Sequence, residues 1–110
     1  MAQEAFRHST IYTLSEAVLY SEGSIVSKVI AKSKNVNLTL FAFDAGQNLS
    51  KHSSPFNAMI QLLDGSARIE IGEESYELSS GNMIIMPANV PHAVEAMGRF
   101  KMMLTMFKVL

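Results

Sequence analysis

The chain of 110 residues contains no cysteine and only three prolines. Without cysteine it can form no disulfide, no thiolate nucleophile and no cysteine-based zinc site. Nine basic and ten acidic side chains nearly cancel, so no strong field draws the chain to nucleic acid or to an anionic membrane. No apolar run is long enough to span a bilayer. These absences argue against a disulfide scaffold and against nucleic-acid or membrane partners.

Along most of the chain, hydrophobic residues alternate with polar ones at a period of two, which is typical of β-strands with one buried face. The predicted strands lie between glycines and polar turns, at 24–31, 36–43, 58–63, 67–71, 75–78, 83–86, 92–97 and 100–109. The pair Asp64 and Gly65 predicts a tight hairpin turn between two of them. Eight or more short strands at regular spacing predict an all-β sandwich or closed barrel.

The length is that of one domain, which buries roughly two-thirds of its unfolded surface. We expect residues 1–22 to form an N-terminal arm that contributes an edge strand or a turn, with a short helical turn near residues 15–19. Residues 23–110 should then form the barrel. The first residues lack the apolar run of a secretion signal, and a chain without cysteine fits a reducing compartment, so we expect a cytoplasmic protein.

Two histidines each follow a glycine-anchored segment, His52 after Gly46 and His92 after Gly81. The run from Gly81 to His92 predicts a turn, a short buried strand, a corner at Pro87 and then the histidine. We expect the two histidines to meet inside the barrel, as ligands or as pocket residues. Simpler interpretations stay open: His52 as a half-exposed loop residue, and His92 as a core residue satisfied by one hydrogen bond.

The first of these segments resembles the first motif of the cupin superfamily, whose members are small jelly-roll barrels, also called double-stranded β-helices. Gly46, His52 and Gly65 are in register with that motif. Ser54 stands where the motif has a second histidine, and Ala58 stands where it has a glutamate. On its own, this partial match is a weak signal.

The second segment resembles the second cupin motif more closely. Gly81, Pro87 and His92 match it, whereas Asn89 replaces a glycine and Ala96 replaces an asparagine. Asparagine is one of the few residues other than glycine that tolerate the left-handed backbone region. Over roughly residues 23 to 109, the chain is similar to small single-domain bacterial cupins, RmlC-like conserved barrels of undefined function.

The resemblance implies a divalent transition metal, such as zinc, nickel, iron, manganese or copper, held by three histidines and one glutamate. Only His52 and His92 of those four ligands are retained. Ser54 is a poor ligand and Ala58 cannot ligate, while Gln61 could supply an oxygen only if a bulge near Ala58 turned it inward. The pocket residues implied by the motifs and by strand alternation are His52, Ser54, Ala58, Ile60, His92 and Val94.

Two functions are compatible with this pattern. The first is a binding module that holds a small, partly apolar molecule in the barrel lumen, with the two histidines as polar or weak metal-ligating groups. A lumen lined by methionines, Phe41 or Phe43, Ile60 and Val94 would form such a pocket. The alternative is a metal-dependent oxygenase or isomerase with an incomplete site. We favour the binding module, because no inward carboxylate is visible that could act as a base.

Two further expectations concern the last strand. Lys101 alternates with Phe100 and Met102 and should face water. The apolar stretch 102–107 and the exposed edge strands should favour self-association, and we expect a homodimer. The expected partners are therefore a small-molecule ligand and a second copy of the chain.

Overall fold

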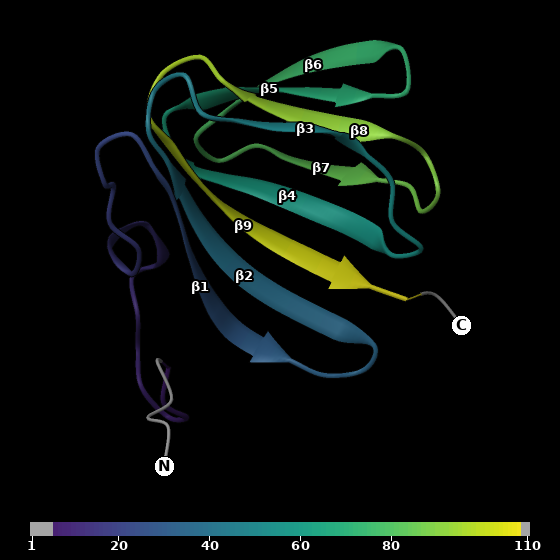
Figure 1. The fold of residues 1–110 in the computed structure, drawn as a ribbon. Helices are drawn as coiled ribbons and strands as arrows, with labels where there is room; N and C mark the ends of the chain where they lie inside the picture. Colours follow the sequence, from purple (N-terminus) through teal and green to yellow (C-terminus); the bar gives the residue numbers. More distant parts are fainter. Residues whose placement is uncertain (1–5, 109–110) are drawn as a thin grey trace.

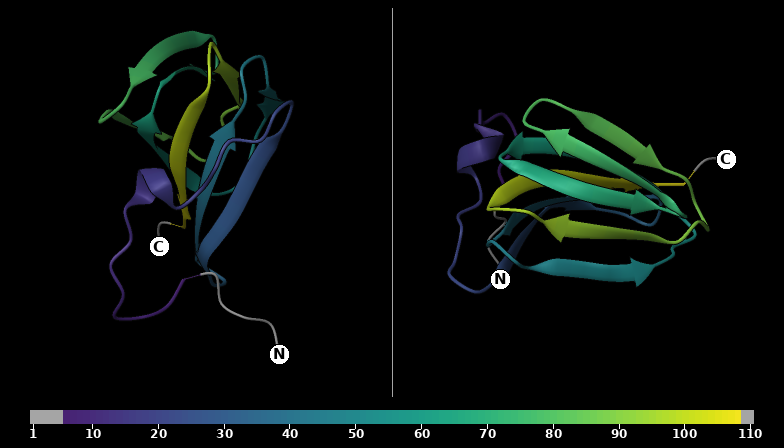
Figure 2. Two further views of the ribbon diagram at one scale, coloured as in Figure 1. Left: turned by 90° about the vertical axis from the view of Figure 1, so that its left-hand side faces the viewer. Right: turned by 90° about the horizontal axis from the view of Figure 1, so that it is seen from above.

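Two antiparallel β-sheets pack face to face in the computed structural model, which describes residues 6–108 (Figure 1). Their strands are β1 (Ile25–Lys32), β2 (Val36–Phe43), β3 (Asn48–His52), β4 (Asn57–Asp64), β5 (Ser66–Ile71), β6 (Glu74–Ser79), β7 (Met83–Met86), β8 (His92–Ala96) and β9 (Phe100–Phe107). The five-stranded sheet has the order β1-β2-β9-β4-β7, and the four-stranded sheet has the order β3-β8-β5-β6. Figure 2 shows the two layers from two further directions. The prediction of an all-β jelly roll is confirmed.

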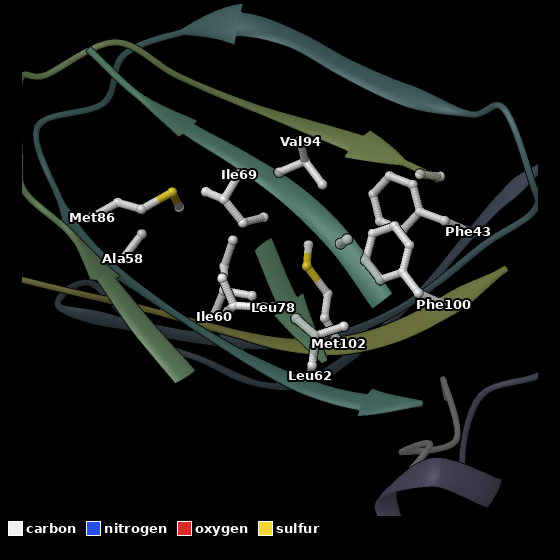
Figure 3. Packing of buried hydrophobic residues seen from close by; sticks show 12 residues of the cluster. Phe43, Ala58, Ile60, Leu62, Ile69, Leu78, Met86, Val94, Phe100 and Met102 are labelled. Carbon is white, nitrogen blue, oxygen red and sulfur yellow. The ribbon is translucent and has the colours of Figure 1, made fainter. Parts of the chain in front are cut away.

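The core lies between the two sheets, where alternate residues of each strand point inward. In β4, Ala58, Ile60 and Leu62 are at most 2% exposed, while Met59 and Gln61 on the other face are half-buried. This alternation buries one apolar face per strand, which is the main favourable contribution to the stability of such a sandwich. Figure 3 shows the resulting cluster of side chains between the strands.

The predicted strands agree with the structure to within a residue or two at most ends, and 36–43 and 83–86 match fully. β3 is not among these ranges, because the sequence leaves its segment open between a strand that ends at His52 and a polar loop. The last strand, predicted to reach Val109, ends at Phe107; Val109 lies outside the described residues. Gly65 in the predicted hairpin has φ +73°, and a Cβ atom there would overlap the carbonyl oxygen of Arg99. Only glycine therefore fits this turn.

An N-terminal arm, residues 6–22, covers part of the outer face of the five-stranded sheet (Figure 1). Its one regular element is the 3-10 turn Leu14–Glu16. This turn overlaps the helical turn expected near residues 15–19 only at Ser15 and Glu16. Val18 of the arm is fully buried against Leu40 and Ala42 of β2. Residues 1–5 of the expected arm lie outside the described part of the chain. Within residues 6–108, no helix has the length and hydrophobicity needed to cross a membrane.

The arm corrects the expectation for Lys101, which is only 8% exposed. Its Nζ donates a hydrogen bond to the Ser15 carbonyl oxygen at 2.6 Å and lies 4.9 Å from the ring centroid of Tyr20. The side chain does point away from the core, but the outer face on which it lies is covered by the arm. The prediction that Lys101 faces water was therefore wrong.

The expectation that residues 102–107 offer a pairing edge is also wrong. β9 is an interior strand, hydrogen-bonded to β2 on one side and to β4 on the other. Met102 is 1% exposed and belongs to the core. Self-association through a strand edge must therefore use another strand.

Candidate functional site

Tight turns at one end of the sandwich bring the two histidines together. Asn89 adopts φ +65°, so the left-handed conformation expected for this residue is confirmed. Its N–H donates to the Ser54 carbonyl oxygen at 2.7 Å, which ties the turn after β7 to the segment after β3. The N–H of Ala88 donates to Oδ1 of Asn57 at 2.9 Å and fixes the same turn to β4. These bonds hold the beginning of β8 beside the end of β3.

His52 and His92 are direct partners in the ladder between β3 and β8. Their ring centroids are 4.5 Å apart, with an angle of 66° between the ring planes. Nδ1 of His52 lies 2.7 Å from the Ser50 carbonyl oxygen, and Nδ1 of His92 lies 3.3 Å from that of Val90. A carbonyl oxygen can only accept, so Nδ1 carries a hydrogen in both rings, and a neutral ring has its lone pair at Nε2.

The two rings differ in their exposure. His52 is exposed at the rim, whereas His92 is 6% exposed. Burial lowers the pKa of His92 below its ordinary value; the Val90 carbonyl opposes this shift, and the nearby His52 adds to it. His92 is therefore held as a neutral imidazole, a hydrogen-bond acceptor at Nε2.

A cavity of about 100 Å³ lies between the sheets below these rings. All six residues expected to form the pocket line it: His52, Ser54, Ala58, Ile60, His92 and Val94. Gln61, considered as a third metal ligand, does not line it. It pairs with Met83 and Met103, and the register of β4 against β9 is regular from Asn57 to Leu62, so no bulge turns Gln61 inward.

The structure adds five lining residues that were not expected by number: Leu49, Met86, Met102, Leu104 and Met106. The alternation of β9 would have placed 102, 104 and 106 on one face, but it could not separate cavity lining from filled core. Phe43, considered as a lining residue, instead stacks on Phe100 with centroids 4.4 Å apart. Figure 3 shows this pair at the end of the cluster away from Met86 and Ala58.

The donor groups of the cavity do not fit the ligand set of three histidines and one glutamate. Among the described residues 6–108, two imidazoles and one hydroxyl line it, and no Asp or Glu does. Within residues 6–108, no group of three or more His, Cys, Asp or Glu side chains is placed to hold a metal ion. The hydroxyl oxygen of Ser54 already accepts a hydrogen bond from the Phe56 N–H, at 3.1 Å.

Comparisons with known proteins agree with the fold. Residues 39–107 match the family described as Cupin domain. A conserved protein of unknown function from Streptococcus pyogenes superposes with a TM-score of 0.91 and 33% identity, over 96% of this chain and 93% of that one. A cupin superfamily protein from Desulfitobacterium hafniense superposes with a TM-score of 0.89 and 23% identity, over 99% of this chain and 100% of that one.

A cupin 2 conserved barrel domain protein from Leptotrichia buccalis gives a TM-score of 0.85 and 36% identity, over 88% of this chain and 47% of that one. A search of the curated proteins finds no match.

Proposed function

Since the chain belongs to the cupin domain family, we propose that its barrel binds a small, partly apolar molecule, with His52 and His92 as polar contacts. The observation that carries this proposal is the cavity at the open end of the sandwich. It combines an apolar lining with two convergent imidazoles and one hydroxyl. An apolar pocket with a few convergent polar groups is the usual form of a small-molecule site.

The size of the cavity limits the ligand. A cavity of 150 Å³ lined by aliphatic and aromatic side chains holds benzene, so about 100 Å³ accommodates on the order of four or five non-hydrogen atoms. A sugar or a nucleotide would not fit without movement of the strands. The candidate ligands are therefore molecules of the size of a short alcohol, aldehyde or amide.

The polar groups further restrict the ligand's chemistry. With Nδ1 bonded to backbone, each neutral ring offers Nε2 as an acceptor, so the ligand should present a hydrogen-bond donor. A hydroxyl group meets this need and can also accept a bond from the Ser54 hydroxyl. The apolar end of the ligand would lie against Ile60, Val94 and the methionines. A short-chain alcohol can thus donate to one of the two imidazoles, accept from Ser54 and place its carbon chain against the apolar lining.

The alternative of a metal-dependent oxygenase or isomerase is less well supported by the same residues. Such an enzyme needs either a fuller ligand set or a base near the substrate. The cavity lining supplies two imidazoles and no carboxylate. One of these imidazoles, that of His92, could accept a proton, but its lowered pKa makes it a weak base.

The proposal can be tested by NMR with methionines labelled at the methyl carbon. Met86, Met102 and Met106 line the cavity, whereas Met83 and Met97 are about half exposed elsewhere. Alcohols and aldehydes of three or four carbon atoms and amides of two or three would be added in turn, which keeps each ligand to about four or five non-hydrogen atoms. We expect saturable shifts of the three lining methyl signals and none of the two exposed ones.

A cavity-filling variant provides the control. Ala58→Leu adds volume inside the cavity and should abolish the shifts, while Ala93→Leu adds the same volume on the outer face of β8 and should not. The proposal fails if no member of the panel shifts the lining methyl signals, or if Ala58→Leu leaves the response unchanged.

We also propose that the protein is a homodimer formed through the part of the five-stranded sheet that the arm leaves open. The outer face there carries uncharged side chains at neighbouring register positions: Val36, Asn57 and Phe107 in one row, and Leu38, Met59, Ile85 and Thr105 in the next. Ile85 is 50% exposed and Val36 is 38% exposed. An uncharged face can meet its own copy across a two-fold axis without burying unpaired charge.

A further inference from the structure

A second pocket, of about 590 Å³, lies between the N-terminal arm and the edge strand β1. We call it the arm pocket; its walls are residues 29–32 of β1 and, from the arm, Phe6, Arg7, His8, Tyr12 and Leu14. It shares no residue with the cavity between the sheets. Its volume falls within the range of roughly 300–1,000 Å³ that is usual for small-molecule sites. The arm pocket is therefore a separate candidate site.

The wall that β1 contributes depends on an irregularity in this strand. Val29 pairs with Thr39 and Ala31 pairs with Leu38, so Ile30 is an extra residue that bulges out of the ladder. In a regular strand, consecutive side chains alternate between the two faces of the sheet, and a bulge at an edge re-aims them. Four consecutive residues of β1 can thus line one pocket, and Val29 is 49% exposed there.

A tight turn in the arm forms the opposite wall. Ser9 adopts φ +56°, a left-handed conformation that is uncommon for a residue other than glycine. The ring of Phe6 lies against that of Tyr12 across this turn, with centroids 5.0 Å apart and the planes at 70°. The N–H of Arg7 donates to the Tyr12 hydroxyl oxygen at 2.9 Å, so the hydroxyl hydrogen remains available to an acceptor in the pocket.

The charges on these walls have one sign. Arg7 and Lys32 are cationic, and no Asp or Glu of residues 6–108 lines the pocket. Neither cation lies within 4.0 Å of a carboxylate oxygen of those residues, whereas Lys51, Arg68 and Arg99 each do. Most of the other lining side chains are aromatic or aliphatic. Such a pocket suits a ligand that is largely apolar and carries a negative charge.

We propose that the arm pocket binds an organic anion with an aromatic body, such as an aromatic carboxylate or sulfonate. The rings of Phe6 and Tyr12 offer edge-to-face or stacked contacts to the aromatic body. Arg7 and Lys32 are exposed, so their long side chains can turn toward the anionic group and supply charge-assisted hydrogen bonds. This site goes beyond the proposed function, because the alcohol-sized cavity uses other residues.

The test uses two dyes that fluoresce when they leave water: anilinonaphthalene sulfonate and phenylnaphthylamine, which has the same ring system without the sulfonate. We expect the sulfonate dye to bind saturably, with one molecule per chain, and more tightly than the uncharged dye. Arg7→Gln/Lys32→Gln should bind the sulfonate dye at least about four-fold more weakly, since each exposed ionic contact contributes a factor of about two to five. Binding of the uncharged dye should not change.

A matched control and a map of the bound dye complete the experiment. Lys51→Gln/Arg68→Gln removes one lysine and one arginine from the four-stranded sheet, and this variant should bind both dyes as the wild type does. Backbone amide signals in NMR spectra locate the sulfonate dye: those of residues 6–14 and 29–32 should shift, while those of His52 and His92 should not.

The proposal is overturned if the sulfonate dye does not bind saturably, or if Arg7→Gln/Lys32→Gln binds it as tightly as the wild type. It is also overturned if the shifted amide signals belong to the cavity between the sheets or to the surface around Ile85. Equal losses in the control variant would show a general effect of net charge and would likewise refute the site.

Discussion

At the scale of single residues, His92 is more buried than the other polar side chains of the cavity, His52 and Ser54. It is 6% exposed, its Nδ1 faces a backbone carbonyl and its ring lies against that of His52. Its proposed role as a hydrogen-bond acceptor requires the neutral form. Burial favours this form, because a charged imidazolium would be poorly solvated there.

The lowered pKa of His92 predicts a pH-dependent stability. The unfolded chain binds a proton at His92 more readily than the folded protein does. The stability due to neutral His92 is thus complete above the ordinary value of about 6.5 and is lost as pH falls toward the folded pKa. We expect the free energy of unfolding in urea to fall between pH 7.5 and pH 5.5. In His92→Gln this fall should be smaller; equal slopes for the two proteins would contradict the prediction.

Asp44 acts in a different pH range. It accepts hydrogen bonds from the Gly23 N–H at 2.6 Å and from Nε of Arg99 at 2.7 Å, and these lower its pKa to about 2. Its contribution to stability is therefore present above its ordinary pKa of about 4 and is lost only between that value and about 2. Asp44 therefore does not contribute to the fall in the free energy of unfolding that is expected from His92 between pH 7.5 and pH 5.5.

At the scale of elements, the N-terminal arm acts as the cover of one sheet face. Val18 is fully buried, whereas the next residue, Leu19, is 68% exposed. We expect Val18→Ala to lower the free energy of unfolding by about 2 kcal/mol, because it removes buried methyl groups and leaves a cavity. Leu19→Ala should change it by about 0.5 kcal/mol or less. Urea unfolding measures both; equal effects would show that the arm does not pack as described.

Strands with one solvent-exposed and one buried face could be predicted from the sequence, whereas the range of β3 could not. Of its five residues only Leu49 is half-buried, so no alternation marks it as a strand. Its pairing depends on β8, which is far away in the sequence. Lys101 was misjudged for a related reason: alternation places its side chain on the outer face, but only the tertiary structure shows that the arm covers that face.

The candidate site was predicted in part for the same physical reasons. Motif spacing located His52 and His92, and strand alternation located Ala58, Ile60 and Val94. The cavity itself could not be predicted, since whether an inward methionine fills space or lines it depends on how both sheets pack. In this structure Phe43 and Phe100 fill one end, and the small Ala58 leaves space at the other.

At the scale of the whole molecule, the outer face of the five-stranded sheet is divided in two. One part is covered by the arm, which buries Leu40 and Ala42. The other part, around Ile85 and Met59, has no cover from within residues 6–108. Exposed apolar side chains that lie together in this way mark a surface that associates, whereas scattered ones do not.

This division leads to a prediction about the mass in solution. The 12.1 kDa chain should have twice that mass by light scattering. Ile85→Glu places one unpaired carboxylate from each copy in the interface and should raise the dimer Kd by about a hundred-fold or more. Met97→Glu, which changes a 53% exposed residue after β8, should leave the dimer intact. A monomeric wild type, or a dimer that persists in Ile85→Glu at micromolar concentration, would place the contact elsewhere or exclude it.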